Sequence, residues 1–305
     1  PAEGICLDDF RAANHALVIG GATIQEINTV RKHLSQVKGG RLRLAAPDAM
    51  FITLVLSDVI GDDLSSIASG PTVQDTTSCA DAMAVLERHR LWDRMPQACR
   101  AHLVRGDTAE AERNALWRDQ LGAHSVNIIV ASNIVLLSSL ERTLAGQPYS
   151  QFISRVCRDA IPVTGTVKAT VEQHFNWAIN ASTVPGTLLL AGGEPIVYVP
   201  PDAHGIGGRM LHYALLAAVS IAGRDWAVLA AGTDGIDGAA PAAGAIVTGD
   251  TVNLARQHGL DAERYLAAFD SYSFFKELES RSGKRVLIVT GPTGTNVNDI
   301  MLWLL

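Results

Sequence analysis

AVLAAGTDGIDGAAPAAG, residues 227–244, begins with a short apolar run and continues into a loop rich in glycine and aspartate. Four more short apolar runs occur along the chain, each bounded by small or polar residues: Phe51–Leu56, Val126–Ala131, Thr187–Ala191 and Val286–Thr290. Such runs, separated by helix-like stretches, are typical of a mostly parallel sheet with helices on both faces. The sequence therefore predicts an α/β protein whose ligands bind beyond the carboxyl ends of the strands.

Composition narrows the classes of protein that this chain could belong to. The 305 residues carry a net charge of −6, and 48% of them are hydrophobic, which suits two folded domains better than a disordered chain. No long run of Lys and Arg indicates nucleic-acid binding, and no apolar stretch approaches the ~18 residues of a membrane-spanning helix. The four cysteines form no CxxC pair, which favours reduced thiols over a zinc site. We therefore expect a cytoplasmic protein without nucleic-acid or membrane partners.

A basic helix face precedes the first predicted strand. Apolar residues recur at helical spacing between Ile27 and Val37, whereas Arg31, Ser35 and Lys38 lie on another face. A solvated helix face explains this pattern, and so does a cationic ridge that binds phosphate or carboxylate.

The loop after the first strand, SDVIGDDLSSIASGPT at residues 57–72, is dense in acids and hydroxyls. Asp58 and Asp62 offer hard oxygen ligands suited to magnesium. The amides and hydroxyls of Ser69, Gly70 and Thr72 could surround a phosphate. The alternative is an ordinary turn with helix-capping Asp and Ser residues.

Three later clusters also follow predicted strands or precede a helix. Gly207, Gly208 and Arg209 come before an apolar helix, where backbone amides and a guanidinium can meet an anion. Met210 stands where a dinucleotide-binding fingerprint would need glycine. The 232–244 loop contains two carboxylates, Asp234 and Asp237, which suit a metal site or a general base. The alternative is a pair of Asp-Gly turns, which are common. The last cluster, TGPTGTNVND at residues 290–299, offers further hydroxyl and amide groups in Thr293, Thr295 and Asn296.

These clusters, in this order, resemble the class II glycerate 2-kinase family, also called the MOFRL family. The matching stretches include INTVRKHLSQVKGG, LSDVIGDDLSSIASGPT, AGGEPIVYV, AGTDGIDGAAPAAGA and GPTGTNVND. The resemblance implies a mostly parallel, Rossmann-like α/β/α sandwich in residues 1–148, incomplete at its N-terminus. It also implies a second, smaller α/β domain of the MOFRL type in residues 149–305.

The resemblance further implies phosphorylation of D-glycerate to 2-phosphoglycerate, with ATP and Mg²⁺, at a cleft between the two domains. Arg209 would clamp the phosphoryl group or the glycerate carboxylate, and Asp234 or Asp237 would orient the 2-hydroxyl and take its proton. Lys38 and Arg31 would neutralise substrate charge, and Asp58 and Asp62 would hold the metal. Binding of substrate or phosphate would involve Ser35, Ser69, Gly70, Thr72, Gly207, Gly208, Thr293, Thr295 and Asn296.

Two departures from the family pattern leave alternatives open. Family members carry a further N-terminal stretch with a Gly-Lys-Ala motif, and this chain starts after it, at Pro1. The family's G-G-R-N-Q-E run reads GGRMLH at residues 207–212. A truncated, non-catalytic form of the kinase therefore remains an alternative, as does a hydroxypyruvate reductase-type oxidoreductase with a nicotinamide cofactor. The small-molecule partners would be D-glycerate and ATP, and a homodimer is possible.

Overall fold

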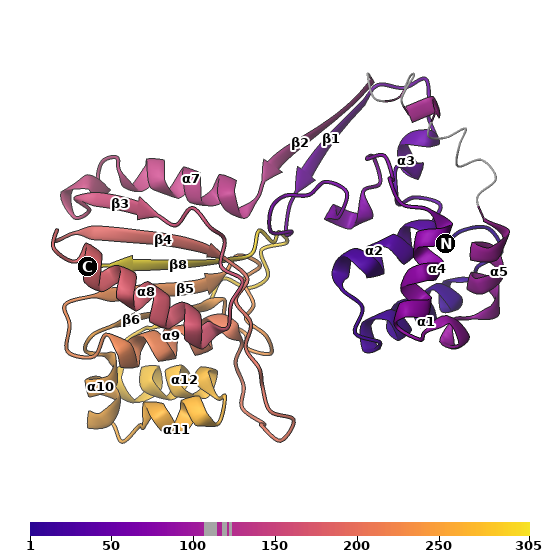
Figure 1. Ribbon diagram of the computed structural model, residues 1–305. Coiled ribbons are helices and arrows are strands. Elements are labelled where there is room, and N and C mark those ends of the chain that lie inside the picture. Colours follow the sequence, from indigo (N-terminus) through magenta and orange to yellow (C-terminus); the bar gives the residue numbers. More distant parts are fainter. Residues whose placement is uncertain (107–114, 118–120, 122–123) are drawn as a thin grey trace. The chain divides into compact units, whose positions relative to one another are not determined.

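A computed structural model describes residues 1–106, 115–117, 121 and 124–305 (Figure 1). The chain folds into two compact units. Unit 1 comprises Pro1–Val55 and Asp62–Ile129, and unit 2 comprises Leu56–Gly61 and Val130–Leu305. No helix in the part of the chain just defined has the length and apolar character needed to cross a membrane.

Unit 1 is built mainly from helices around a small apolar core. The helices are α1 (Leu7–Ile19), α2 (Ile24–His33), α3 (Arg41–Leu44), α4 (Cys79–Arg88) and α5 (Gln97–Arg105), with 3-10 turns η1 (Ile67–Ser69) and η2 (Trp92–Arg94). Capping boxes start α1, α2 and α4, which satisfies the free amides of their first turns. Leu17, Val30, Leu86 and Leu103 are fully buried between these helices and hold them together.

Two strands accompany the helices of unit 1. β1 (Phe51–Leu56) and β2 (Ser125–Ala131) form a two-stranded sheet, and Figure 1 shows them running in the same direction. Their side chains alternate between half-buried and exposed positions. Both strands end where the chain passes into unit 2, so the segments that follow them are held close together there, with the Ser57 amide donating to the Ala131 carbonyl at 2.8 Å.

Unit 2 contains a six-stranded sheet. Its strands lie in the order β3 (Arg155–Arg158), β4 (Thr187–Gly193), β8 (Asp299–Leu304), β5 (Ala227–Gly232), β6 (Gly244–Thr248) and β7 (Leu287–Ile288). The β3–β4 pair is parallel, and each of the other neighbouring pairs is antiparallel. The last strand of the chain, β8, therefore lies between β4 and β5.

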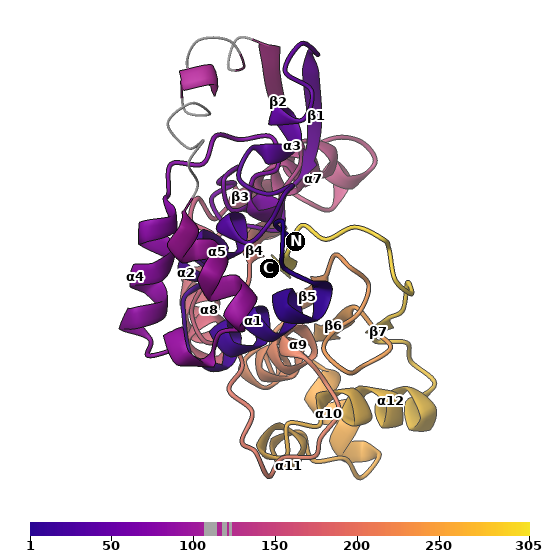
Figure 2. The same cartoon turned by 90° about the vertical axis from the view of Figure 1, so that its right-hand side faces the viewer.

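Helices cover both faces of this sheet. On one face, α7 (Asn133–Leu144) packs through Leu137 against Leu188 and Leu190 of β4. On the other, α8 (Val167–Ala181) and α9 (Arg209–Ser220) pack against Leu189 and Trp303. Figure 2 shows the remaining helices grouped together beyond α9: α10 (Thr251–Gln257), α11 (Ala262–Ala267) and α12 (Ser271–Ser282). A short turn, η5 (Tyr149–Gln151), follows α7.

The predicted α/β class is confirmed, and the sheet is mixed. In unit 2, β3, β4, β5 and β7 run in one direction, and β6 and β8 run in the other. The expectation of mostly parallel neighbours is therefore wrong for this sheet. The physical reason is that a continuous apolar run indicates a strand buried on both faces, as the helices bury this sheet. Such a run does not indicate the direction of the neighbouring strand.

The division into domains 1–148 and 149–305 stays a prediction. The compact units instead divide the chain between Ile129 and Val130, with Leu56–Gly61 also in unit 2, which is the larger of the two. Helix α7 belongs to unit 2 because it packs on β3 and β4.

Candidate functional site

A pocket of about 920 Å³ opens in unit 2 where the carboxyl ends of β4 and β5 meet the start of α9. Strand β8 enters the sheet at the same place, with Asp299 paired with Gly193 on one side and Gly232 on the other. The charged or titratable residues that line the pocket are Glu194, Arg209, His212, Asp234, Asp237 and Asp299. Apolar side chains such as Ile196, Val197 and Phe269 complete its wall.

Arg209, the first residue of α9, is held by two carboxylates in this pocket. Its Nε lies 2.5 Å from Oδ2 of Asp299, and its Nη1 lies 2.7 Å from Oε1 of Glu194. Burial opposes the charge on Arg209, but the hydrogen bonds and charges of the two acids outweigh it and raise the pKa of the guanidinium. Arg209 is therefore a fixed cation at the edge of the pocket.

Asp299 is almost completely buried beside that cation. Burial raises the pKa of its carboxyl to about 7, while the hydrogen bonds and charge of Arg209 act in the opposite direction. A buried carboxyl with a raised pKa in a pocket is a common feature of functional sites.

Asp237 holds the first turn of α9. Its Oδ1 accepts from the Met210 amide at 3.1 Å, and its Oδ2 accepts from the Leu211 amide at 2.7 Å. Burial raises the pKa of Asp237 to about 6. Gly208 makes this approach possible, because a Cβ there would lie 2.2 Å from Oδ1 of Asp237. Both oxygens of Asp237 are thus engaged with the helix backbone.

Asp234 and the 290–299 loop form one connected turn region. The Asp234 carbonyl accepts from the Thr293 amide at 2.9 Å, and the Thr293 hydroxyl donates to the Thr233 carbonyl at 2.7 Å. Within the loop, the Thr295 amide donates to the Thr293 hydroxyl at 3.4 Å and Oδ1 of Asn296 accepts from the Asn298 amide at 2.9 Å. These contacts hold the loop beside Asp234.

His212 and Phe269 form an aromatic part of the pocket wall. Their rings stack with centroids 5.2 Å apart and planes inclined by 6°. Burial lowers the pKa of His212, which favours a neutral imidazole at neutral pH. Gly207 lies close by, and its carbonyl accepts from the Ala239 amide at 3.4 Å.

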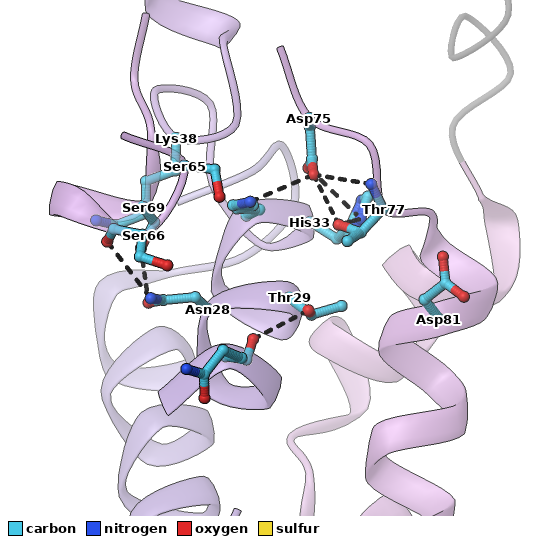
Figure 3. A network of polar contacts seen from close by, with 12 residues as sticks. Asn28, Thr29, His33, Lys38, Ser65, Ser66, Ser69, Asp75, Thr77 and Asp81 are labelled. Carbon is cyan, nitrogen blue, oxygen red and sulfur yellow. Dashed lines mark hydrogen bonds and ion pairs between the residues drawn. The ribbon is translucent and has the colours of Figure 1, made fainter. Parts of the chain in front are cut away.

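A second group of predicted residues lies in unit 1, where the loop after α2 (residues 34–40) runs beside the loop that contains η1 (residues 62–72) (Figure 3). The ammonium of Lys38 donates to the Ala68 carbonyl at 2.8 Å, and the Gly39 amide donates to the Ser69 carbonyl at 2.9 Å. The Ser69 hydroxyl donates to Oδ1 of Asn28 at 2.9 Å. Burial and the charge of Arg31 lower the pKa of Lys38.

The other predicted residues of unit 1 also have partners in that unit. Nε of Arg31 donates to Oδ1 of Asn14 at 2.6 Å, and the Ser35 hydroxyl accepts from the Lys38 amide at 3.2 Å. The Thr72 hydroxyl donates to Oδ1 of Asn127 at 2.6 Å. The Gly70 carbonyl accepts from the Gly40 amide at 2.7 Å. The Arg31 contact joins α2 to α1, the Ser35 contact lies within one loop, and the other two join loop residues to each other and to β2, so these residues serve the local fold whatever else they bind.

An acidic residue in the same unit was missed by sequence analysis. Asp75 lies 3.5 Å from the ammonium of Lys32 and 3.7 Å from Nε2 of His33, and it accepts from the Thr77 hydroxyl at 2.7 Å (Figure 3). Asp75 follows no predicted strand, so the sequence gives no sign that it joins this polar cluster, and only its contacts in the structure show it.

The two predicted magnesium ligands belong to different units. Asp58 is exposed in unit 2, where its carbonyl accepts from the Asn298 side chain at 2.9 Å, and Asp62 lies in unit 1 with a φ of 56°. Within residues 1–106, 115–117, 121 and 124–305, no three His, Cys, Asp or Glu side chains gather as a metal site requires. The assignment of Asp58 and Asp62 to a metal stays a prediction.

The structure thus brings Gly207, Gly208, Arg209, Asp234 and Asp237 to one pocket. It also places Glu194 and Asp299 there, which sequence analysis did not assign to the site. Both had a usable signal, because each is an acid at the end of a glycine-containing cluster: Glu194 follows Gly192-Gly193, and Asp299 ends the 290–299 cluster.

Family models match both units. A model described as a domain of unknown function matches residues 1–104, and the model of the MOFRL family matches residues 187–299. The second match includes Glu194, Arg209, Asp234, Asp237 and Asp299 of the pocket.

Curated relatives match nearly the whole chain. The glycerate 2-kinase of Pyrococcus horikoshii is 36% identical over 99% of this chain and 66% of its own length. An Agrobacterium vitis protein that is provisionally named a hydroxypyruvate reductase is 38% identical over 98% of this chain and 65% of its own length. The chain therefore spans about two thirds of the length of these relatives.

A solved structure has the same fold. The crystal structure of the glycerate kinase from Thermotoga maritima superposes with a TM-score of 0.83 and is 32% identical in sequence. The match covers 100% of this chain and 69% of that chain.

Proposed function

Because the chain belongs to the glycerate kinase family, we propose that it transfers a phosphoryl group from ATP to D-glycerate and forms 2-phosphoglycerate. The observation that carries this proposal is Arg209, a cation held by Asp299 and Glu194 at the edge of the unit 2 pocket. The relatives are longer than this chain, so the activity of the whole protein is part of the proposal.

Arg209 has the chemistry that phosphoryl transfer needs. The reaction depends mainly on positioning and on stabilising the charge of the transferred group. A guanidinium presents a planar fork of donors that matches carboxylate and phosphate oxygens. Asp299 and Glu194 hold that fork in place, so little reorganisation is needed when the substrate binds.

The proton of the 2-hydroxyl requires an acceptor, and we assign this role to Asp234. Asp237 was an equal candidate from sequence, but its two oxygens accept from the backbone amides of α9. Asp299 is paired with Arg209. Asp234 lines the pocket two residues after the end of β5. Among the residues that the structure describes, only its Oδ1 accepts from a backbone amide, that of Ile236 at 3.3 Å, which leaves Asp234 the better placed of the two predicted bases.

We further propose Mg²⁺ as the cofactor, with Asp58 and Asp62 as its candidate protein ligands. Asp58 and Asp62 have the hard carboxylate oxygens that this ion prefers, and the nucleotide phosphates would supply others. When bound, the ion would neutralise charge on the phosphates. Lys38 and Arg31 of unit 1 are proposed to bind anionic groups of the substrate or of ATP.

Incubation of the chain with ATP, Mg²⁺ and D-glycerate tests the proposal, with products followed by phosphorus NMR and mass spectrometry. We expect 2-phosphoglycerate. Replacing Arg209 by Ala should lower kcat/KM by a factor on the order of 10²–10³, because a preorganised donor is lost. Arg256→Ala is the matched control, since Arg256 is exposed on α10 and does not line the pocket. A decrease below threefold in Arg209→Ala would remove Arg209 from the mechanism.

The same preparation separates the alternatives. NADH-dependent reduction of hydroxypyruvate, without transfer from ATP, would replace the kinase proposal by the oxidoreductase. Retained ATP binding in calorimetry without product would indicate a non-catalytic form. Absence of both product and ATP binding would contradict the proposed function of this chain.

A further inference from the structure

Three aromatic residues form a hydrogen-bonded chain in the core of unit 2, outside the pocket. The indole N–H of Trp303 donates to the Tyr213 hydroxyl oxygen at 2.8 Å, and that hydroxyl lies 2.6 Å from Nδ1 of His174. All three side chains are buried, with relative exposures of 1% or less. They come from three elements, α8, α9 and β8.

The direction of the hydrogen bonds in this chain follows from the chemistry of the groups. An indole N–H can only donate, so Tyr213 must accept from Trp303, and its single hydroxyl hydrogen is left for His174. Burial lowers the pKa of His174 to about 4 and raises the pKa of Tyr213 well above its usual range, so both are neutral. His174 therefore accepts at Nδ1 and carries its hydrogen on Nε2, an atom without a hydrogen-bond partner among the residues that the structure describes.

The chain connects the same two elements that carry the charged pair of the pocket. Tyr213 lies one helical turn after Arg209 on α9, on the same side of the helix. Trp303 lies four residues after Asp299 on β8, on the same face of the strand, which is the buried face. Helix α9 and strand β8 are thus joined twice, by Arg209 with Asp299 at the pocket and by Tyr213 with Trp303 in the core.

We propose that Tyr213, held between His174 and Trp303, is a positioning residue that sets α9 along β8 so that the Arg209 guanidinium meets Asp299. A buried hydroxyl with two partners has little freedom to shift, and neither do the elements that carry the partners. Small displacements of a positioned group lower rates strongly, on the order of 10²-fold for 1 Å. The consequence for catalysis rests on the proposed function, whereas the effect on Arg209 does not.

Tyr213→Phe is the direct test, because it removes the hydroxyl and keeps the ring. The readout is the Nε–H resonance of Arg209 in a proton–nitrogen correlation spectrum, assigned by its absence in Arg209→Ala. We expect Tyr213→Phe to move this resonance toward the position of a solvent-exposed arginine. We also expect kcat/KM for D-glycerate phosphorylation to fall about tenfold.

Tyr265→Phe is the matched control. Its hydroxyl donates to Glu277 at 2.8 Å, so the variant loses one tyrosine hydrogen bond, but Tyr265 does not line the pocket. The Arg209 resonance should stay in place in this variant.

A double variant, Tyr213→Phe with His174→Leu, separates positioning from simple stability. Replacing His174 as well removes the imidazole nitrogen that Tyr213→Phe leaves unsatisfied, although the Trp303 indole N–H still lacks its acceptor, so folding stability should return in part. If Tyr213 positions Arg209, the resonance stays displaced in the double variant. An unchanged resonance in Tyr213→Phe, or its return together with stability in the double variant, would overturn the inference. A displaced resonance in a chain that shows no phosphoryl transfer would leave the inference standing and contradict only the proposed function.

Discussion

The two units shift the pKa values of their carboxyl groups in opposite directions. In unit 1, hydrogen bonds from the backbone and hydroxyls of neighbouring Ser and Thr residues lower the pKa of Glu26, Asp63 and Asp81. In the pocket of unit 2, burial raises the pKa of Asp237 to about 6 and that of Asp299 to about 7. Carboxyl groups in the two units therefore exist in two different electrostatic environments.

The direction of the pKa shift distinguishes two kinds of carboxylate. In one kind the ionised group stabilises the folded state, and in the other the ionised group destabilises it. Glu26 and Asp81 complete capping boxes at the starts of α2 and α4, so their charge favours the folded state. Ionised Asp237 and Asp299 are buried, and burial of charge opposes folding. Groups of the second kind are typical of functional sites.

The largest expected effect is on activity, in the variant Asp299→Asn. Loss of the charge beside Arg209 should lower kcat/KM on the order of 10²–10³-fold, because the guanidinium is no longer fixed. The free energy of unfolding at pH 8 should change by less than about 1 kcal/mol, since the variant also removes the cost of a buried carboxylate. Steady-state kinetics and urea unfolding measure the two quantities.

Asp225→Asn controls for this variant, because Asp225 is an exposed acid of unit 2 outside the pocket. It should change neither quantity. Activity of Asp299→Asn within threefold of the parent chain would show that Asp299 is a structural residue like the capping acids Glu26 and Asp81 of unit 1. That result would contradict the functional role of the pocket carboxylates.

The second effect is a pH dependence of stability that differs in direction between the units. Asp237 and Asp299 have raised pKa values, so the folded state binds more protons than the unfolded state between pH 4 and 7. Their contribution to the stability of unit 2 is complete below pH 4 and is lost as the pH rises through 6 and 7. The loss should be on the order of a few kcal/mol. The pKa of Glu26 is lowered from 4.5 to about 2, so its contribution to unit 1 is lost as the pH falls through that range.

Hydrogen exchange measures this difference, because it reports α9 and β8 separately from α2 and α4. After correction for intrinsic exchange rates, protection of α9 and β8 should decrease from pH 4.5 to 7, while protection of α2 and α4 stays constant. Asp299→Asn should reduce the decrease. An equal slope in both units would contradict the assignment of the raised pKa values to the pocket.

Much of the fold could be predicted because burial leaves a mark in the sequence. β4 and β5 are continuous apolar runs, and the structure places both as strands in the buried sheet of unit 2. β1 is an equally apolar run and also forms a strand, but its side chains alternate between half-buried and exposed positions. The position of β8 could not be predicted. Its pairing with both β4 and β5 joins segments far apart in the chain, and no local pattern encodes that choice of neighbours.

The same long-range pairing limited the prediction of the site. Arg209, Asp234 and Asp237 were named as candidates because they lie near the ends of strands or at the start of a helix, and all three line the pocket. Asp299, one of the two partners of Arg209, was not predicted. It reaches Arg209 because β8 lies between β4 and β5, where Asp299 pairs with Gly193 and Gly232. Asp237 was predicted to act on substrate, whereas both its oxygens accept from the first turn of α9. Residue type and strand position thus identify candidate groups, and only the packing shows which of them already have partners.

The smallest expected effect is on stability alone, in unit 1. Ser78 is the N-cap of α4, where its hydroxyl accepts from the Asp81 amide at 3.1 Å. Ser78→Ala should lower the stability of unit 1 by about 1 kcal/mol, because a cap hydrogen bond is lost and the Asp81 carboxylate loses a donor.

Thr76→Ala is the control, because Thr76 is exposed in the loop before α4 and the variant removes a hydroxyl outside the cap. Its stability should stay at the parent value. Urea unfolding gives the free energy, and hydrogen exchange in α4 locates the change. Phosphoryl transfer by folded Ser78→Ala protein should keep its parent kcat/KM, because Asp81 completes a helix cap and lies outside the pocket. A loss of activity larger than the loss of folded protein would mean that the capping carboxylate of Asp81 also takes part in the chemistry.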